Sequence, residues 1–298
     1  MTKGKGTRLG AIEALWRYPV KSMLGEAIRQ SAADERGLLG DRSYALLDRA
    51  TGFVASAKHP QKWSRLLQCR AAYVSEPRQG EVLPPVLITL PDGRSAQSTD
   101  AHVNDLLSEF LQREVSLIHD APATPMREAD RTPLEDEGAP PLIRQEKMAS
   151  AAPAGTFFDY APVHLLTTAA LRQLQMDHAD SRDRAGANDA RRFRPNLIVD
   201  VGAGDHGYVE NTWLGRDCVI GGAARLKLID PSPRCVIVTS AHGNDLPREP
   251  QLLRTLARHN CVASVTAAPG HLFQAVLGVY ARVLEAGSLR VGDPLVLV

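Results

Sequence analysis

The amino-acid sequence predicts a strand-rich, mixed α/β fold in which β-barrels carry a few packed helices. Three observations favour this class. Only 5% of the residues are aromatic, while 23 glycines and 20 prolines indicate many short elements joined by turns. The apolar runs are short, and most end at turn-forming residues. Few strand–helix–strand repeats fit the order of these runs, which disfavours a doubly wound parallel sheet.

In the first half of the chain, short apolar runs predict a series of strands. The first, at residues 11–20, stops at Pro19, because proline has no backbone N–H for a β-ladder. One helix is expected at residues 102–111, where apolar side chains recur at helical spacing, with Asp100 as its cap. The other expected strands are residues 44–48, 66–74, 86–90 and 115–118.

The middle of the chain, residues 121–155, contains six prolines and shows neither helical nor strand periodicity. We expect an irregular connection there, which is either a solvated linker or a lid over a site. This divides the chain into a first domain at residues 1–120, the linker or lid at residues 121–155, and a second domain at residues 156–298.

The second half again combines short strands with two helices. The first helix is expected to begin at Thr167 or Thr168, where a hydroxyl can accept a hydrogen bond from a free backbone N–H. The second helix is expected near residues 250–259. The expected strands are residues 163–166, 196–201, 218–220, 224–229, 235–239, 276–284 and 295–298.

The overall charge excludes a globally basic binder. There are 35 Lys and Arg residues against 34 Asp and Glu residues, so any anionic ligand must be held by a local arrangement. We therefore expect no nucleic-acid partner. The sequence has no run of about 18 apolar residues to span a membrane, and its first residues lack the apolar core of a signal peptide. No membrane partner is expected either.

The four cysteines, Cys69, Cys218, Cys235 and Cys261, are far apart in the sequence. No CxxC pair is present for zinc, an iron–sulfur cluster or redox exchange. This pattern is typical of a reducing compartment, and we expect a cytoplasmic protein.

Two turn-rich motifs in the first half offer polar side chains to a ligand. In Tyr18-Pro19-Val20-Lys21-Ser22, a strand end is followed by an ammonium group and a hydroxyl, which suit phosphate. In Gly37-Leu38-Leu39-Gly40-Asp41-Arg42, the glycines permit a sharp turn, and Asp41 can orient Arg42. A solvated strand end and a surface ion pair explain the same motifs without any ligand.

Two more motifs lie in the second half. In Arg191-Arg192-Phe193-Arg194-Pro195-Asn196, the proline is expected to force Arg194 into an extended conformation. In Pro231-Ser232-Pro233-Arg234-Cys235, the guanidinium can favour the thiolate of Cys235, which a soft metal or an electrophile requires. The alternatives are a solvated basic loop and a cysteine that is a small core residue.

Taken in order, these motifs resemble those of the MOSC family, in the form in which a MOSC N-terminal β-barrel domain precedes a MOSC domain. This is the architecture of the mitochondrial amidoxime reducing component and its bacterial relatives. The resemblance covers nearly the whole chain, except the linker and residues 240–275. It runs through YPVKS, GLLGDR, DYAPVHLLTTAAL, RFRPN, Trp213, PRC and SLRVGDPLVLV.

The resemblance implies a pocket for the molybdenum cofactor, Mo-molybdopterin, whose pterin carries the metal on a dithiolene and bears a phosphate. It implies that Cys235 is the protein thiolate on molybdenum. It also implies that the phosphate and pterin are held by Lys21, Ser22, Arg42 and Arg194. Further contacts would come from Arg234, Asp159, Asn196 and the backbone near Tyr160 and Ala161. At the level of the family, the resemblance also implies binding of pyridoxal phosphate.

The activity that the resemblance implies is molybdenum-dependent reduction of N-hydroxylated or related N-oxygenated small molecules by two electrons. The sequence carries no appended cysteine cluster after its last expected strand. A reductase of this kind would therefore receive its electrons from a separate flavin, haem or iron–sulfur protein.

Two stretches depart from the family pattern. After Cys235 the chain reads Val-Ile-Val-Thr-Ser-Ala-His-Gly-Asn-Asp, where the family usually carries a Thr-x-Asp-Pro-x-Thr-Gly-like loop. Glu210 is followed by Asn211 in place of an aspartate. Two other functions therefore stay open. One is a carrier module for the molybdenum cofactor or sulfur, without turnover. The other is a molybdenum-free barrel recruited to a biosynthetic step.

Overall fold

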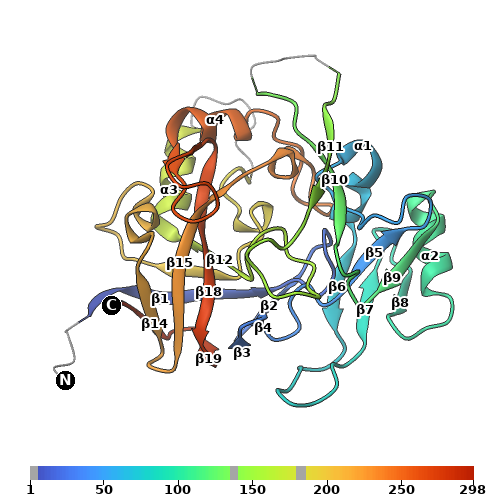
Figure 1. Ribbon diagram of the computed structural model, residues 1–298, viewed down its shortest axis with the longest axis horizontal. Coiled ribbons are helices and arrows are strands. Elements are labelled where there is room, and N and C mark those ends of the chain that lie inside the picture. Colours follow the sequence, from blue (N-terminus) through green and yellow to red (C-terminus); the bar gives the residue numbers. More distant parts are fainter. Residues whose placement is uncertain (1–5, 135–139, 179–185) are drawn as a thin grey trace.

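Seven strands close into a barrel in the computed structural model, which describes residues 6–134, 140–178 and 186–298. The order is β13-β12-β18-β15-β14-β20-β1, and the ring closes because β1 pairs with both β20 and β13. In Figure 1, β1 crosses the lower part of the tall strands β15 and β18. The barrel strands are β1 (Thr7–Arg17), β12 (Val163–Thr167), β13 (Leu197–Asp200), β14 (Asp217–Ile220), β15 (Ala224–Pro233), β18 (Val276–Glu285) and β20 (Pro294–Leu297).

The predicted strand-rich mixed fold is confirmed, and the described residues contain four short α-helices. Strand β1 comes from the start of the chain, yet it completes a barrel whose other strands all follow residue 162. The division at residues 120 and 155 stays a prediction.

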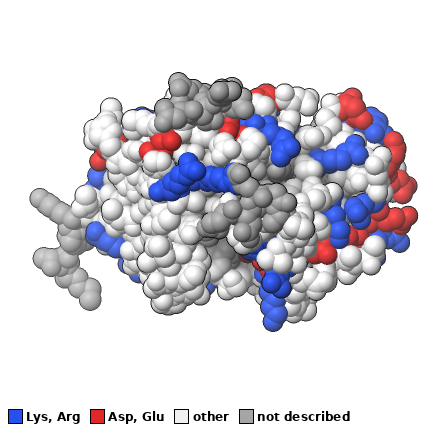
Figure 2. Space-filling view, turned by 90° about the horizontal axis from the view of Figure 1, so that it is seen from above, with Lys and Arg blue, Asp and Glu red and all other residues white. Residues whose placement is uncertain are grey.

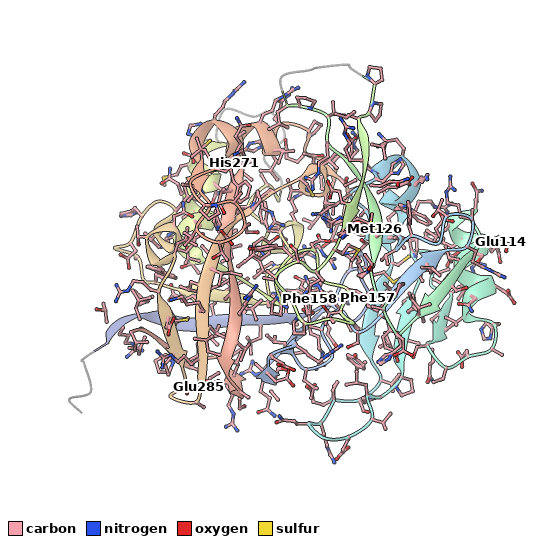
Figure 3. The ribbon with its side chains drawn as sticks, in the orientation of Figure 1. Glu114, Met126, Phe157, Phe158, His271 and Glu285 are labelled. Carbon is pink, nitrogen blue, oxygen red and sulfur yellow. The ribbon has the colours of Figure 1, made fainter. Side chains whose placement is uncertain are left out.

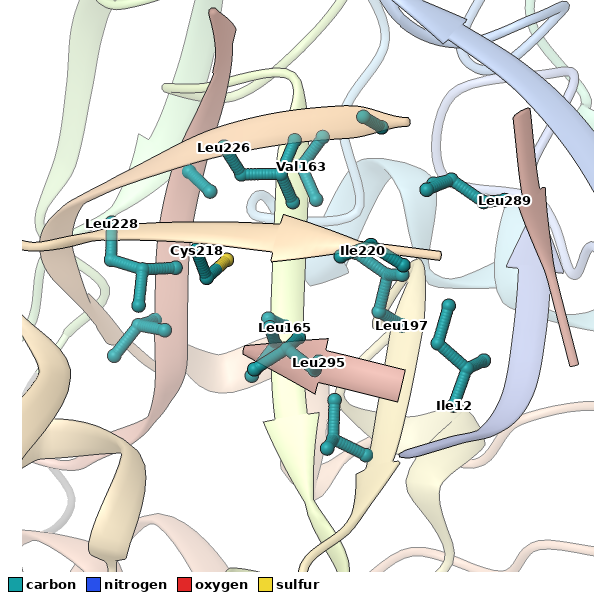
Figure 4. Packing of buried hydrophobic residues seen from close by; sticks show 14 of the residues in the cluster. Ile12, Val163, Leu165, Leu197, Cys218, Ile220, Leu226, Leu228, Leu289 and Leu295 are labelled. Carbon is teal, nitrogen blue, oxygen red and sulfur yellow. The ribbon is translucent and has the colours of Figure 1, made fainter. Parts of the chain in front are cut away.

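The barrel interior is filled by aliphatic side chains from alternating strand positions (Figure 4). Leu165, Ile220 and Leu226 are completely buried there. Burying a side chain of this size contributes roughly 1.5–3 kcal/mol, so this core fixes the positions of the strands that lead to the site.

A second group of elements packs on its own core, which contains Trp63, Val86 and Leu107. In this group β5 pairs with β9, and β7 lies between β6 and β8. Its elements are β5 (Ala45–Asp48), α1 (Pro60–Trp63), η1 (Ser64–Gln68), β6 (Arg70–Tyr73), β7 (Val86–Thr89), β8 (Ser95–Gln97), α2 (Val103–Leu111) and β9 (Val115–Ile118).

Two predictions in this group were partly wrong. The strand expected at residues 66–74 is a 3-10 helix followed by β6, because Leu66 and Leu67 are buried in two different clusters. A short apolar run does not distinguish these conformations. Asp100 does not cap α2 with its side chain; its Oδ2 accepts from Gln97 N at 2.7 Å instead.

The segment at residues 121–155, expected to be irregular, contains an antiparallel hairpin of β10 (Met126–Asp130) and β11 (Ile143–Lys147). Each of its five cross-strand pairs contains a charged side chain, and one joins opposite charges: Arg127 lies opposite Glu146 and donates to its Oε2 at 3.2 Å. Such pairs stabilise a hairpin without an alternating apolar pattern, which explains why periodicity did not reveal it. Residues 135–139 of this segment lie outside the described residues.

The helices α3 (Thr168–Asp177) and α4 (Leu252–His259) pack on the barrel through a third core that includes Leu174, Leu256 and Leu277. The predicted cap of α3 is confirmed, since Thr167 Oγ1 accepts from Ala170 N at 3.0 Å. None of the described helices is both long and apolar enough to cross a membrane. The remaining elements are β2 (Glu26–Ile28), β3 (Gln30–Asp34), β4 (Gly37–Leu38), η2 (Ala190–Arg192), η3 (Val209–Trp213), β16 (Val262–Ala263), β17 (Leu272–Phe273) and β19 (Gly287–Arg290).

The strand expected at residues 235–239 was wrong. Strand β15 continues through Pro231 to Pro233, where irregular pairing with β18 accommodates prolines that cannot donate to a ladder. The chain then turns into a 3-10 helix, η4 (Val236–Thr239), in which Val238 N donates to Cys235 O at 3.2 Å. Cys235 therefore lies at the junction of a strand end and a tight turn.

Candidate functional site

Two connected cavities meet at Cys235. The smaller one, which we call the inner chamber, measures about 70 Å³. The larger one, the outer cleft, measures about 1350 Å³ and shares six lining residues with the chamber. The chamber is walled by Phe157 and Phe158, which lie at the centre of the molecule between the barrel and the second group of elements (Figure 3).

Sequence positions far apart converge on the inner chamber. Tyr160 lines the outer cleft, and Asn196 lines neither cavity. The other predicted site residues all line the chamber: Lys21, Ser22, Arg42, Asp159, Arg194, Arg234 and Cys235.

Asp159 is the anionic centre of one chamber wall. Its carboxylate accepts from Lys21 Nζ and Arg127 Nη1, and lies 3.3 Å from Lys58 Nζ. Although burial opposes it, these three cations hold the pKa of Asp159 well below its usual range. Lys58 and Arg127 were missed by the sequence analysis, because single basic residues outside turn motifs gave no signal.

Lys21 is buried in the same wall, with 5% of its surface exposed. Its Nζ also donates to Phe157 O at 3.1 Å. Burial lowers the pKa of Lys21 to about 7, with Arg127 and Lys58 acting in the same direction and Asp159 against it. The ammonium group is therefore held where an additional anion would stabilise its charged form.

Tyr18 organises the opposite wall, and it too was missed as a site residue. The guanidinium carbons of Arg42 and Arg194 lie 4.3 Å and 4.4 Å from the centroid of its buried ring. Such contacts attract each guanidinium electrostatically. Burial, together with repulsion from Arg42, lowers the pKa of Arg194 to about 10. The phenol ring thus holds two like charges close together.

Asp41 and Asn196 support this wall from behind. Asp41 pairs with Arg42, as predicted, and its Oδ1 accepts from Tyr18 N at 2.7 Å. Asn196 donates from Nδ2 to Asp41 Oδ2 at 2.9 Å. Asn196 is thus placed to orient the aspartate that orients Arg42, and does not itself face either cavity.

The chamber has an unusual backbone. Ser22, Arg42 and Arg194 all adopt positive φ angles, of 65°, 47° and 56°. The expectation that Pro195 forces Arg194 into an extended conformation was therefore wrong. Only six non-glycine residues in the described ranges have positive φ, and these three all line the chamber. Because such angles cost free energy, strain gathered in one place is typical of a functional site.

Arg234 and Cys235 form the boundary between the two cavities. Arg234 donates to Ser232 Oγ at 2.7 Å and to Phe193 O at 2.8 Å, while its buried Nε has no hydrogen-bond partner. Cys235 is a free, half-buried thiol that packs partly on Ile237 and also lines both cavities. It is therefore available to a ligand, which a wholly buried core cysteine would not be.

His164 also lines the chamber, although the sequence analysis gave it no role. One ring nitrogen, Nε2, lies 3.1 Å from Leu277 O. Burial, with the nearby charge of Arg234, lowers the pKa of His164 to about 3, so the ring is neutral at physiological pH. Its position within the matched stretch DYAPVHLLTTAAL was the only available signal.

One wall of the outer cleft is fastened to the barrel by Asp230. Its two carboxylate oxygens accept from the backbone N–H groups of Val265, Thr266 and Ala267, each at 2.9 Å. Tyr160 donates its hydroxyl to the same carboxylate. Tyr160 therefore contributes to the cleft through a side chain that positions Asp230.

Comparison with known proteins matches two family models to this chain. The MOSC domain model matches residues 153–296, and the MOSC N-terminal beta barrel domain model matches residues 9–73. Mitochondrial amidoxime-reducing component 1 of Mus musculus is 25% identical over 97% of this chain and 83% of that protein. Mitochondrial amidoxime reducing component 2 of Bos taurus is 26% identical over 96% and 83%. The crystal structure of the YUAD protein from Bacillus subtilis aligns with a TM-score of 0.42 and 11% identity, over 97% of this chain and 94% of that one.

Proposed function

For this MOSC-domain protein with a MOSC N-terminal beta barrel domain, we propose molybdenum-cofactor-dependent reduction of N-hydroxylated small molecules. The observation that carries the proposal is the convergence of seven separately predicted residues on one chamber beside Cys235. The similarity to amidoxime-reducing components supports a role linked to the molybdenum cofactor, and the specific substrate class is our inference from both.

The residues of the chamber fit an anionic cofactor with a soft metal. Within the described part of the chain, Arg194 and Arg234 donate only to backbone carbonyls and a serine hydroxyl, so neither guanidinium is hydrogen-bonded to a carboxylate there. Arg234 Nε is a buried donor without an acceptor. Bringing such cations together is costly unless an anion compensates them, and the phosphate of the cofactor would do so.

In this proposal Lys21, Ser22, Arg42, Arg194 and Arg234 hold the phosphate and the pterin, and Cys235 supplies the thiolate ligand of molybdenum. Asp159 holds Lys21 in place through its ion pair. Asn196 acts indirectly, by orienting Asp41 and through it Arg42. The cofactor supplies two-electron chemistry at molybdenum when it is bound.

The overall reaction is R–NHOH plus two electrons and two protons to give R–NH₂ and water, so the N–O bond breaks and the oxygen leaves as water. The chain must therefore deliver two protons beside Cys235. Outer-cleft residues admit the substrate from solvent. We further propose that a separate flavin, haem or iron–sulfur protein supplies the electrons.

The proposal is tested by cofactor content and turnover in two cysteine variants. Wild type purified from a host that makes the cofactor should contain molybdenum and pterin in about equal amounts. It should also reduce benzamidoxime with a chemical reductant. Cys235→Ala should lose molybdenum or turnover, whereas Cys261→Ala, which changes an exposed thiol outside both cavities, should match wild type.

Other results of this test would correct the proposed ligand or favour a different function. If Cys235→Ala retains molybdenum and turnover, the assigned ligand is wrong. A loaded wild type without turnover would favour a carrier module, and a wild type free of molybdenum and pterin would favour a recruited barrel. Bound pyridoxal phosphate would be detected by its visible absorbance, which borohydride treatment removes. The expected cytoplasmic location stays a prediction, which fractionation of the source cells tests.

A further inference from the structure

The outer cleft carries cationic side chains that the proposed cofactor contacts do not use. Five of them line the cleft and not the inner chamber: Arg127, Arg131, Lys147, Arg248 and Arg254. Viewed from above, the face that carries the β10–β11 hairpin and α4 shows a band of Lys and Arg side chains across its middle (Figure 2). Lys and Arg side chains thus gather on this part of the described surface although the whole chain is nearly neutral.

The carboxylates of the cleft leave part of this charge uncompensated. Glu146 is shared by two cations, Arg127 and Arg131. Asp130 accepts from Thr132, and Asp230 is occupied by the loop that it fastens. Among the described residues, each carboxylate that lines only the cleft is therefore already engaged, and none of them pairs with Lys147 or Arg248.

Three donors in the cleft lack partners. The side chains of Lys147 and Arg248 form no hydrogen bond or ion pair within residues 6–134, 140–178 and 186–298. Arg127 is 4% exposed, and its buried Nε has no acceptor. A buried guanidinium nitrogen without an acceptor costs free energy, which a ligand anion in the cleft would offset.

The same cleft also has an apolar side. Leu253 and Phe273 line it, and Leu272 lines it while 56% exposed, which makes it one of the most exposed large apolar residues of the described chain. The cleft reaches Cys235 at its inner end. A molecule that fits here has an apolar body, one end at Cys235 and an anionic group facing the cations.

We propose that the outer cleft selects N-hydroxylated substrates that carry an anionic group, a carboxylate or a phosphate, on an apolar body. This inference rests on the proposed function, because it concerns the substrate of that same site. Electrostatic attraction raises both the encounter rate and the affinity of such a substrate, and added salt weakens both.

The test compares benzamidoxime with its 4-carboxylate, its 4-phosphonate and the methyl ester of the carboxylate, using cofactor-loaded protein and a chemical reductant. At low ionic strength, kcat/KM for the carboxylate should exceed that for the ester about tenfold, as expected for one charge-assisted contact. A larger gain for the phosphonate would identify phosphate as the preferred anion. Raising the salt should shrink the ratio.

Arg248→Gln should reduce the carboxylate-to-ester ratio several-fold. Arg78→Gln makes the same charge change at an exposed arginine outside both cavities and should leave the ratio at its wild-type value. Equal values of kcat/KM for carboxylate and ester, or a ratio that Arg248→Gln does not change, would overturn the inference.

Calorimetry that measures the binding of the carboxylate and of the ester distinguishes a failure of this inference from a failure of the proposed function. Turnover of all compounds without selectivity overturns only the charge preference. Selective binding of the carboxylate without turnover of any compound overturns the reductase proposal and leaves the anion site standing.

Discussion

The inner chamber and the outer cleft are both lined by cations, but they are built in opposite ways. Chamber cations come from distant segments, are held by an aromatic ring or an ion pair, and sit partly on strained backbone. Cleft cations such as Lys147 and Arg248 are exposed and have no partner among the described residues. The difference indicates a fixed site for one ligand beside an adaptable site for others.

This difference explains how a chain with a net charge of +1 presents a strongly basic site. Together the two cavities are lined by ten Lys and Arg residues and four Asp and Glu residues. The chamber offsets part of the cost of this charge with Asp159, Asp41 and the Tyr18 ring. The cleft leaves the charges of Lys147 and Arg248 to solvent, where they are inexpensive.

The largest effect should come from Lys21, the buried cation of the chamber. In cofactor-free protein, folded Lys21 loses its proton near pH 7, whereas unfolded lysine keeps it to about pH 10.4. The folded state therefore gains stability as pH rises through this window. Lys21→Met should remove that gain. The difference in free energy of unfolding between wild type and variant should then change with pH by at most about 1.4 kcal/mol per unit.

The measurement for Lys21 is urea unfolding at several pH values from 7 to 9.5. Lys147→Met is the matched control, because Lys147 is exposed in the folded protein as it is in the unfolded chain. The free energy difference between wild type and this control should not change with pH. Parallel curves for wild type and Lys21→Met would show that the chamber does not penalise the charged lysine.

A smaller effect is expected where the cleft wall joins the barrel. Asp230→Asn leaves one carbonyl oxygen where two carboxylate oxygens accept from the loop amides. We expect a loss of about 1–3 kcal/mol in the free energy of unfolding. Amide exchange at Val265, Thr266 and Ala267 should become faster, while cofactor content stays at the wild-type level. Unchanged exchange at these amides would contradict the fastening role.

The backbone strain of the chamber should be visible in a pair of substitutions at one position. Arg194 has a φ of 56°, which glycine adopts without the steric cost that alanine keeps. The free energy of unfolding of Arg194→Gly should therefore exceed that of Arg194→Ala by about 1 kcal/mol, which means that the glycine variant is the more stable. Equal stability of the two variants in thermal or urea unfolding would remove the strain argument.

The smallest effect belongs to the outer cleft. Arg248→Gln removes an exposed side chain without a partner, so its free energy of unfolding should lie within about 0.5 kcal/mol of the wild-type value. Urea unfolding at pH 7 tests this. A loss of several kcal/mol would mean that the cleft is as rigidly built as the chamber.

Much of the fold and part of the site could be predicted from the sequence. Short apolar runs that form strands, such as the one at residues 163–166, and the hydroxyl cap of α3 were found because local chemistry determines them. The β10–β11 hairpin was missed because charged pairs, not apolar alternation, stabilise it. The turn after Cys235 was missed because a four-residue apolar run fits either a strand or a 3-10 helix.

The chamber motifs were visible because glycine, proline and arginine cluster in short stretches of sequence. Asp41 was given its pairing with Arg42 because the two are neighbours in sequence. Tyr18 could not be given its role, because it depends on a contact across the fold: its ring contacts Arg194, which is 176 positions later. The outer-cleft cations were not visible either. Lys147 and Arg248 look like ordinary surface residues in the sequence, and only the folded structure brings them to one cavity.

The most direct test of the division between the two regions is the molybdenum and pterin content of Arg194→Ala and Arg248→Ala, purified side by side from a host that makes the cofactor. Both variants should be folded by circular dichroism. We expect Arg194→Ala to lose most of its cofactor and Arg248→Ala to retain the wild-type amount. Full cofactor in Arg194→Ala, or an equal loss in both variants, would contradict the assignment of the chamber to the cofactor and of the cleft to the substrate.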